Sequence, residues 1–376
     1  AQPTTPSYFS YGDKAFYYPY LHVMDDDIEE YLTGNANISS SINPVTTLRN
    51  FYIWAKEPFM RISGLTFRDY DWKRMYEHIG YLNVIISYVK EFHEDSEEMR
   101  HRILGEAQFL RAGYYFMLVN LYANPYSKET ADATMGVPLN LTEYIEEGYF
   151  SRDPVAAVYR QIVTDLENAI VNLSGIKQPT IYRVNEKAAR ALLSRVYLYM
   201  QDWENAKSTA EKLLAQNGAL LDYSSIAENT DGYAISEKSP ELLFSQGPLN
   251  LQCEFSGSGG DFCVSNDLYK LYDENDYRQT IYFTRSTQSD SLGLNRKYQM
   301  GKHRSYVSDI FTLRTAEGYL NAAEACAMLG DAGAASGWLN RLRGKRIKDY
   351  EDVVYTADEI IEQVRVERRK ELCLEG

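Results

Sequence analysis

The segment that most constrains the fold is GEAQFLRAGYYFMLVNLY at residues 105–122, which is apolar on almost every side. Its rings, from Phe109 to Tyr122, stand among leucines, alanines and a methionine, and no polar face interrupts them. A helix of this kind has no side that water would prefer, so other elements bury it. We therefore predict a helical scaffold built around this segment, with its rings in the core rather than on a binding surface.

Helical patterns also occur on both sides of this segment. Apolar residues recur at three-to-four spacing from Trp72 to about Phe92. SRDPVAAVYRQIVTDLENAIVNL follows at 151–173, and we expect Asp153 to cap a helix that has Pro154 at its first position. The final stretch, TADEIIEQVRVERRKELCLEG, predicts another helix.

Two further segments have the pattern of a helix-turn-helix unit of the tetratricopeptide type. They are ALLSRVYLYMQDWENAKSTAEKLL at 191–214 and LRTAEGYLNAAEACAMLGDAGAASGWLNRLR at 313–343, each with small residues and an aspartate at the turn. Two copies at irregular spacing predict helical pairs within a larger fold, not a regular solenoid.

Residues 1–71 and 218–308 are rich in turn-forming residues and predict loops. A connection as long as the second one is usually functional or disordered. We expect rings on helices to be buried and rings on loops to be available for ligands. In the second loop region these rings are Tyr233, Phe255, Phe262, Tyr282, Phe283, Tyr298 and Tyr306.

Composition excludes several classes of function. A net charge of −14 disfavours binding to nucleic acid or to anionic lipid. No apolar run approaches the roughly 20 residues of a membrane span. The four cysteines are too few and too scattered for a disulfide scaffold or a zinc site, and Cys253 and Cys263 are either bridged or unpaired.

Catalytic signatures are missing from the sequence. There is no H-x-x-x-H metal motif, no G-x-S-x-G elbow and no phosphate-binding loop. The acidic run Asp25 to Asp27 lacks calcium-binding spacing, and we interpret it as a solvated turn. We therefore predict no catalytic residue, no bound metal and no cofactor.

Several segments, in order, resemble the SusD/RagB family of surface nutrient-binding lipoproteins. They are WKRMYEHIGYLNVII at 72–86, GEAQFLRAGYYFMLVNLYANPY at 105–126, GVPL at 136–139, VSNDLYKLYDENDYR at 264–278 and VRVERRKELCLEG at 364–376. Gln108 stands where the family usually has arginine. Asp276 and Arg278 belong to the fourth of these motifs.

The resemblance implies a mostly α-helical, single SusD-like domain over residues 1–376, with about four tetratricopeptide-like helical pairs. The helical scaffold would lie mainly at 72–122, 152–217 and 309–376, and the loop-rich binding parts at 1–71 and 218–308. Family members begin with a lipidated cysteine and continue past the closing motif. We therefore expect the anchor and a C-terminal portion of the family to be absent from this chain.

The resemblance also implies a function. Such a protein would bind a starch-like or other oligosaccharide at the cell surface without changing it. It would deliver this ligand to a SusC-like, TonB-dependent transporter in the outer membrane, to which an N-terminal lipid anchor would hold it. The alternatives are a peptide-binding RagB-type protein, a tetratricopeptide adaptor and, less favoured, an all-helical glycosidase.

Sugars present flat apolar faces ringed by hydroxyls, so a capture site needs aromatic platforms beside amide, carboxylate or guanidinium groups. Residues 51–71 and 255–306 have this mixture. No family motif assigns individual ligand residues here, and a structural role is the alternative for each candidate. The candidates are Trp54, Phe67, Tyr70 and Asp71 from the first region, with Phe255, Phe262, Arg296 and Tyr298 from the second.

Overall fold

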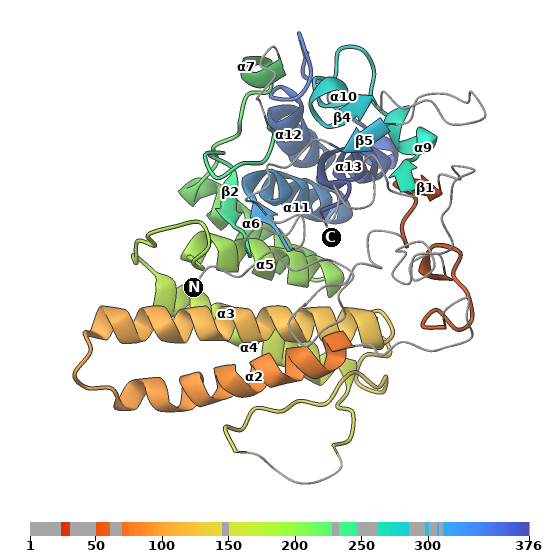
Figure 1. Cartoon of the computed structure of the whole chain (residues 1–376). Coiled ribbons are helices and arrows are strands. Elements are labelled where there is room, and N and C mark those ends of the chain that lie inside the picture. The colour runs from red at the N-terminus through yellow and green to blue at the C-terminus, as the bar shows by residue number, and fades with distance from the viewer. Residues whose placement is uncertain are drawn as a thin grey trace.

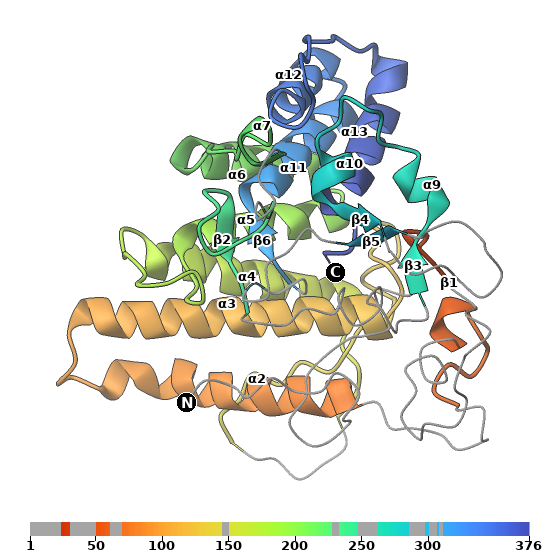
Figure 2. The same ribbon diagram turned by 45° about the horizontal axis from the view of Figure 1, so that its top comes forward.

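The fold is mostly α-helical, as predicted, and is drawn in Figures 1 and 2 from a computed structural model. The eight longest helices of the described residues form two groups. The structure describes residues 24–30, 50–60, 70–144, 150–227, 233–246, 262–285, 298–300, 307 and 311–375.

The first group of helices stacks in chain order. α2 (Tyr70–Tyr88), α3 (Glu97–Tyr122), α4 (Val155–Leu173) and α5 (Glu186–Tyr199) each contact the next along the chain. A short 3-10 helix, η2 (Val89–Glu91), continues α2. In Figure 2, α2 and α3 run side by side across the lower half of the molecule. This packing places α3 between α2 and α4.

α3 is the central helix that the sequence predicted. Its N-terminus is capped by Ser96, whose hydroxyl accepts a hydrogen bond from the Met99 N–H at 3.1 Å. Phe109, Tyr115 and Phe116 are buried, which confirms their assignment to the core, whereas Tyr114 and Tyr122 are only partly buried against it. Gly105 permits the close approach of α4, because a Cβ there would lie 2.6 Å from Cγ of Leu173.

Both predicted helix-turn-helix units are confirmed. α6 (Trp203–Gln216) packs against α5, and α12 (Ala332–Arg343) packs against α11 (Thr315–Met328). The two turns use the same local geometry. A residue with positive φ, Gln201 or Gly330, precedes an aspartate that accepts the hydrogen bond of the N–H three residues later. These aspartates cap the second helix of each pair.

The second group of helices surrounds α11. The alanines of this helix are buried, and their small side chains let α6, α12 and α13 (Ala357–Leu372) approach it. Gly318 extends this close contact, since a Cβ there would lie 2.9 Å from Leu213 Cδ2. The apolar side of α13 includes Ile360 and Val364, which are both buried.

One predicted helix start is wrong in detail. α4 begins at Val155, and Asp153 does not cap it. The Asp153 carboxylate instead accepts a hydrogen bond from the Leu139 N–H at 2.8 Å. The strand-like pairing of Met135 with Pro154 explains this, because it holds the chain in an extended conformation immediately before the helix.

Residues 218–308, predicted as loops, contain short elements. The three two-stranded sheets of the described chain are antiparallel and pair β1 with β3, β2 with β6, and β4 with β5. Within 218–308 the short elements are α7 (Ser224–Ala227), β2 (Leu242–Phe244), β3 (Phe262–Val264), α9 (Asn266–Tyr269), α10 (Arg278–Ile281), β4 (Phe283–Arg285) and β5 (Tyr298–Met300). Two of the paired strands lie outside this range, β1 (Ile28–Glu30) and β6 (Leu313–Arg314).

The expectation that loop rings are available and helical rings buried is wrong for several residues. Tyr282 and Phe283 are buried, because they pack edge to face against Tyr272. Conversely, Tyr81 on α2 and Tyr199 on α5 are 67% and 50% exposed. Ring position along the chain therefore does not predict exposure in this protein.

Candidate functional site

A buried ionic cluster surrounds the inner face of α13. Glu371, at its centre, accepts hydrogen bonds from Arg278, Arg314 and Arg346 at 2.6–3.1 Å. These four side chains are almost completely inaccessible to solvent. The cluster joins five cations to five carboxylates, namely Arg278, Arg314, Arg343, Arg346 and Lys370 to Glu241, Asp276, Glu367, Glu371 and Glu375.

The cluster is electrically balanced, and the pKa values follow from its contacts. Burial alone would raise the pKa of Glu371, but Arg346, Arg314 and Arg278 hold that pKa well below its usual value. Aromatic rings cover the charges, and the Arg346 guanidinium lies 3.9 Å from the centre of the Tyr223 ring. Since every charge is paired, this cluster holds segments together and offers nothing to a ligand.

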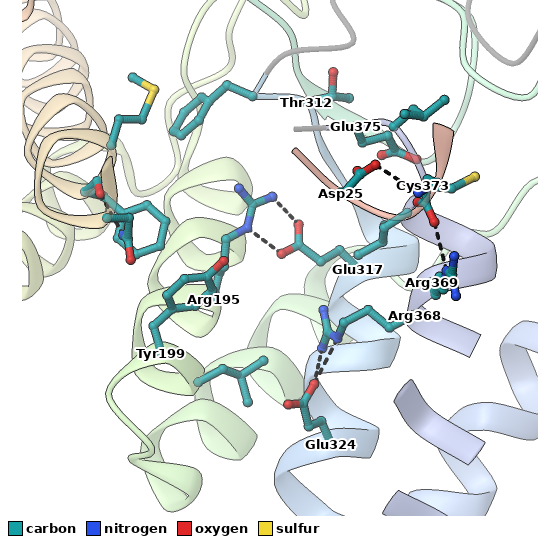
Figure 3. Close-up of a pocket in the computed structure, with 18 of the residues that line it drawn as sticks. Asp25, Arg195, Tyr199, Thr312, Glu317, Glu324, Arg368, Arg369, Cys373 and Glu375 are labelled. Atoms are coloured by element: carbon teal, nitrogen blue, oxygen red, sulfur yellow. Dashed lines mark hydrogen bonds and ion pairs between the residues drawn. The ribbon is translucent and has the colours of Figure 1, made fainter. Parts of the chain in front are cut away.

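A cavity of about 530 Å³ lies on the other side of α13 (Figure 3). Its walls come from α3, α5, α11 and α13, from residues 311–312 and 373–375, and from the acidic segment at residues 25–27. The volume is within the range of about 300–1,000 Å³ that is typical of small-molecule sites. None of the residues proposed from the sequence lines it.

Two ion pairs in the cavity wall leave polar groups unused. Arg195 binds Glu317 through Nε and Nη2 at 2.6 and 2.7 Å, which Figure 3 shows as a bridge between α5 and α11. Arg368 binds Glu324 through Nε at 2.9 Å, and its Nη2 donates to Asn321. Within the described ranges, Nη1 of both arginines and Oε1 of Glu324 have no hydrogen-bond partner.

The Arg195 guanidinium is held in its charged form by its partner. Burial alone would lower the pKa of Arg195, but the charge and hydrogen bonds of Glu317 raise it above its usual value. A guanidinium in a bidentate pair has a fixed orientation. The free Nη1 group of Arg195 is therefore a donor at a fixed position.

Aromatic side chains form the wall beside these pairs. Tyr199 packs edge to face on Phe116, with ring centres 5.0 Å apart, and Phe311 completes this side of the cavity. The Tyr199 hydroxyl has no hydrogen-bond partner among the residues that the structure describes. The wall thus joins apolar faces to a hydroxyl and a guanidinium.

The acidic run at residues 25–27 forms the rim of the cavity, and it is not the fully solvated turn that the sequence predicted. Asp27 is buried, and its carboxylate accepts a hydrogen bond from Arg369 Nε at 2.8 Å. Asp25 keeps solvent contact, although the protein around its carboxylate, and then the charge of Asp27, raises its pKa to about 7. Because solvent screens the charge of this exposed carboxylate, Asp25 adds little to the free energy of unfolding.

The residues proposed from the sequence are only partly described. Trp54 is 70% exposed, and Asp71 is buried in the first turn of α2, where a carboxylate suits the positive end of the helix dipole. Phe67, Phe255 and Arg296 lie outside the described residues. Tyr70, Phe262 and Tyr298 lie at the start of α2, in β3 and in β5, and their side chains are outside the description. Ligand contact by all of these residues stays a prediction.

Trp54 is held in an unusual backbone conformation. Its φ angle of 51° lies in the left-handed region that residues with a side chain rarely adopt. Asn50 fixes the turn, because its carbonyl accepts a hydrogen bond from the Ala55 N–H at 2.8 Å and its side-chain amide donates to the Met60 carbonyl. Phe51 anchors the turn from inside by packing edge to face on Phe59.

No cluster of three or more metal-ligating side chains occurs in the part of the chain that the structure describes. Nor does any helix in that part combine the length and apolar character that a membrane span requires. The cavity and the Trp54 turn both present aromatic rings, and the cavity adds hydrogen-bonding groups to them.

Comparison with known proteins identifies the family. A family profile described as starch-binding and associating with the outer membrane matches residues 25–198, and the SusD family profile matches residues 293–376. The chain belongs to the SusD family. This confirms the resemblance found in its motifs.

Relatives within the SusD family show the same fold. SusD-like protein P25 from Formosa agariphila is 25% identical over 179 residues, which are 47% of this chain and 32% of that protein, so the match spans about a third of the relative. A SusD superfamily protein from Bacteroides thetaiotaomicron has a TM-score of 0.75 at 24% identity, over 95% of this chain and 81% of its own. A laminarin-binding SusD-like protein has a TM-score of 0.68 at 20% identity, over 95% of this chain and 84% of its own.

Proposed function

We propose that this SusD-family chain binds an oligosaccharide at the cell surface without altering it. It then passes the ligand to a SusC-like, TonB-dependent transporter of the outer membrane. The observation that carries the proposal is the exposed indole of Trp54 on a turn that is fixed from both ends. The laminarin-binding relative supports it, because this fold is able to present a glycan site.

The energetics of the turn support a role in binding. Placing a tryptophan in left-handed backbone geometry costs roughly 1–2 kcal/mol, and exposing its ring forgoes the gain from burying it. Backbone strain that the surrounding structure maintains is a feature of ligand-binding sites. Lys56 and Glu57 follow Trp54 within three residues and are exposed, and we propose that they supply charged hydrogen-bonding groups for sugar hydroxyls.

The chemistry of the site favours binding over catalysis. An open aromatic surface stacks on the flat face of a sugar ring and holds it by apolar contact. A few such platforms give affinities of about micromolar to millimolar, or roughly −8 to −4 kcal/mol. Affinity in this range allows a protein that feeds a transporter to release its ligand.

The test is an array of glycans and peptides probed with the 376-residue chain, its Trp54→Ala variant and its Tyr81→Ala variant. Tyr81 is a matched control, since its ring on α2 is equally exposed but belongs to no proposed site. We expect Trp54→Ala to weaken binding to one saccharide class by at least about tenfold. Both substitutions should change the free energy of unfolding by less than about 0.5 kcal/mol.

Three results would contradict the proposal. Unchanged saccharide binding by Trp54→Ala would remove the proposed platform. Binding of peptides alone would favour the RagB-type or adaptor alternative. Shortening of oligosaccharides by the purified chain, abolished by one Glu→Gln substitution, would show a glycosidase.

Transfer of the ligand requires a separate experiment. We expect the protein, purified from native membranes under mild detergent conditions, to bring a TonB-dependent transporter with it. Purification in a single-component form would contradict the transporter partnership and leave glycan binding standing.

A further inference from the structure

We propose that the cavity between α3, α5, α11 and α13 is a second binding site, which takes a short neutral saccharide or the end of a glycan chain. It is independent of the Trp54 turn, because none of its lining residues comes from residues 50–60. The site would hold its ligand by an aromatic wall and by the unused groups of two fixed ion pairs (Figure 3).

The hydrogen-bonding groups in the wall match a sugar diol. Nη1 of Arg195 and of Arg368 are donors, and Oε1 of Glu324 is an acceptor, while the other atoms of each pair hold them in place. Neighbouring sugar hydroxyls both donate and accept, so they can bind a guanidinium and a carboxylate together. Hydrogen bonds to charged groups contribute more to binding than neutral ones do.

The aromatic wall gives the apolar half of the site. Tyr199 is half exposed, and its edge-to-face contact with Phe116 fixes its plane. Its ring can pack on the C–H face of a pyranose while its hydroxyl bonds a sugar oxygen. An apolar ligand of similar size would bury the unused donors without a partner, which is unfavourable.

The charges in the wall decide which saccharides enter. Five carboxylates line the cavity against three guanidinium groups, and one of the five, Glu375, is also paired with Arg314 of the buried cluster. This excess of negative charge repels uronic and sulfated sugars. Neutral saccharides carry no such penalty, and the cavity volume suits one or two sugar rings.

The experiment measures binding of maltose, cellobiose, laminaribiose and glucuronic acid to the 376-residue chain by saturation-transfer NMR and calorimetry. We expect at least one neutral disaccharide to bind in the micromolar to millimolar range and glucuronic acid to bind at least about tenfold more weakly. The measurements are repeated in the Trp54→Ala background, which removes the site proposed above, and we expect the binding in the cavity to remain there.

Three variants locate the binding in the cavity. Tyr199→Ala removes the ring and should weaken the disaccharide at least about tenfold. Tyr199→Phe keeps the ring and removes only the hydroxyl, so the loss should be about threefold. Glu324→Gln keeps the shape of the side chain and should weaken binding about fivefold by removing a charged acceptor.

Tyr81→Ala is the matched control and should bind as the unmodified chain does. If Tyr199→Ala lowers thermal stability strongly, Glu324→Gln and Tyr199→Phe decide the matter, since both retain the volume of the replaced side chain. Binding of no neutral saccharide, or equal binding by Tyr199→Ala and Tyr81→Ala, would overturn the proposal. Loss of disaccharide binding on Trp54→Ala would overturn the independence of the two sites.

Discussion

Both faces of α13 carry ion pairs between arginines and carboxylates, but the surroundings of these pairs differ. On the inner face, Glu371 accepts hydrogen bonds from three arginines and is fully buried. On the cavity face, Arg368 meets one carboxylate, that of Glu324, and both side chains are partly exposed. The number of partners for each charge separates a closed structural cluster from a wall that can accept a ligand.

The geometry of the helix explains why one element can serve both purposes. Glu367 and Glu371 are four residues apart and share one face of α13. Arg368 follows Glu367 directly and therefore points away from that face, toward α11 and the cavity. Buried charges cost free energy unless they are paired and hydrogen-bonded. The inner face satisfies this condition, and solvent relaxes it at the cavity face.

We expect the largest loss of stability from a substitution at the centre of the inner face of α13. Glu371→Gln leaves three buried guanidinium groups facing a neutral side chain, and we expect a loss of about 5 kcal/mol in the free energy of unfolding. Chemical denaturation measures it, with Glu362→Gln on the exposed side of the same helix as the matched control. A loss equal to that of the control would mean that the cluster does not stabilise the fold.

We expect an intermediate loss of stability at the ion pair between Arg195 and Glu317 in the cavity wall. Arg195→Met removes the partner of the buried Glu317 carboxylate and should cost about 3 kcal/mol, less than at the inner face because one charge loses its partner there instead of three. The double variant Arg195→Met with Glu317→Leu should recover part of this loss, since no charge is left alone. A double variant less stable than the single one would contradict this account.

The pH dependence of stability sharpens the comparison. The native pKa values of Glu371, Glu367 and Asp276 are depressed by neighbouring cations, which outweigh burial. Their stabilisation is therefore complete above their unfolded-state pKa values and is lost as the pH falls below about 4.5 through the native values. We expect the chain to lose about 2 kcal/mol more than Glu371→Gln between pH 5 and pH 3 in denaturant titrations. Equal losses would show that Glu371 is not paired in solution.

The smallest effect is expected at the cavity face. Glu324→Gln breaks a partly exposed ion pair and should lower the free energy of unfolding by less than about 1 kcal/mol. The same variant should weaken saccharide binding, so stability and affinity separate at this position. A stability loss as large as that of Glu371→Gln would place Glu324 with the structural cluster and break the distinction between the two faces.

The sequence predicted the scaffold because helices depend on local patterns. The apolar run at 105–122 and the two Asp-capped turns are determined by residues close to one another in the chain. Exposure was harder to predict, because it depends on what packs from elsewhere. Tyr282 resembles a free loop ring in the sequence, but it is buried by contacts that include Tyr272 and, 59 residues away in the chain, Tyr223.

The cavity could not be predicted, because its walls come from segments far apart in the chain. Arg195, Glu317 and Arg368 have no distinctive spacing, and each looks like an ordinary surface charge on a helix. The sequence did contain a pattern that points to the buried ionic cluster on the inner face of α13. The motifs containing Asp276, Arg278 and Glu371 place charges beside apolar residues, and the structure shows that these charges pair with one another.

The contact between Asp27 and Arg369 has a consequence for the order of assembly. It joins residues 342 positions apart, whereas the α5–α6 and α11–α12 pairs form from neighbouring residues. Local pairs form quickly, and a closure over such a separation must wait until nearly the whole chain is in place. We expect pulse-labelled amides at residues 24–30 to gain protection after those of α5, so that the acidic rim closes last on a framework that has already formed.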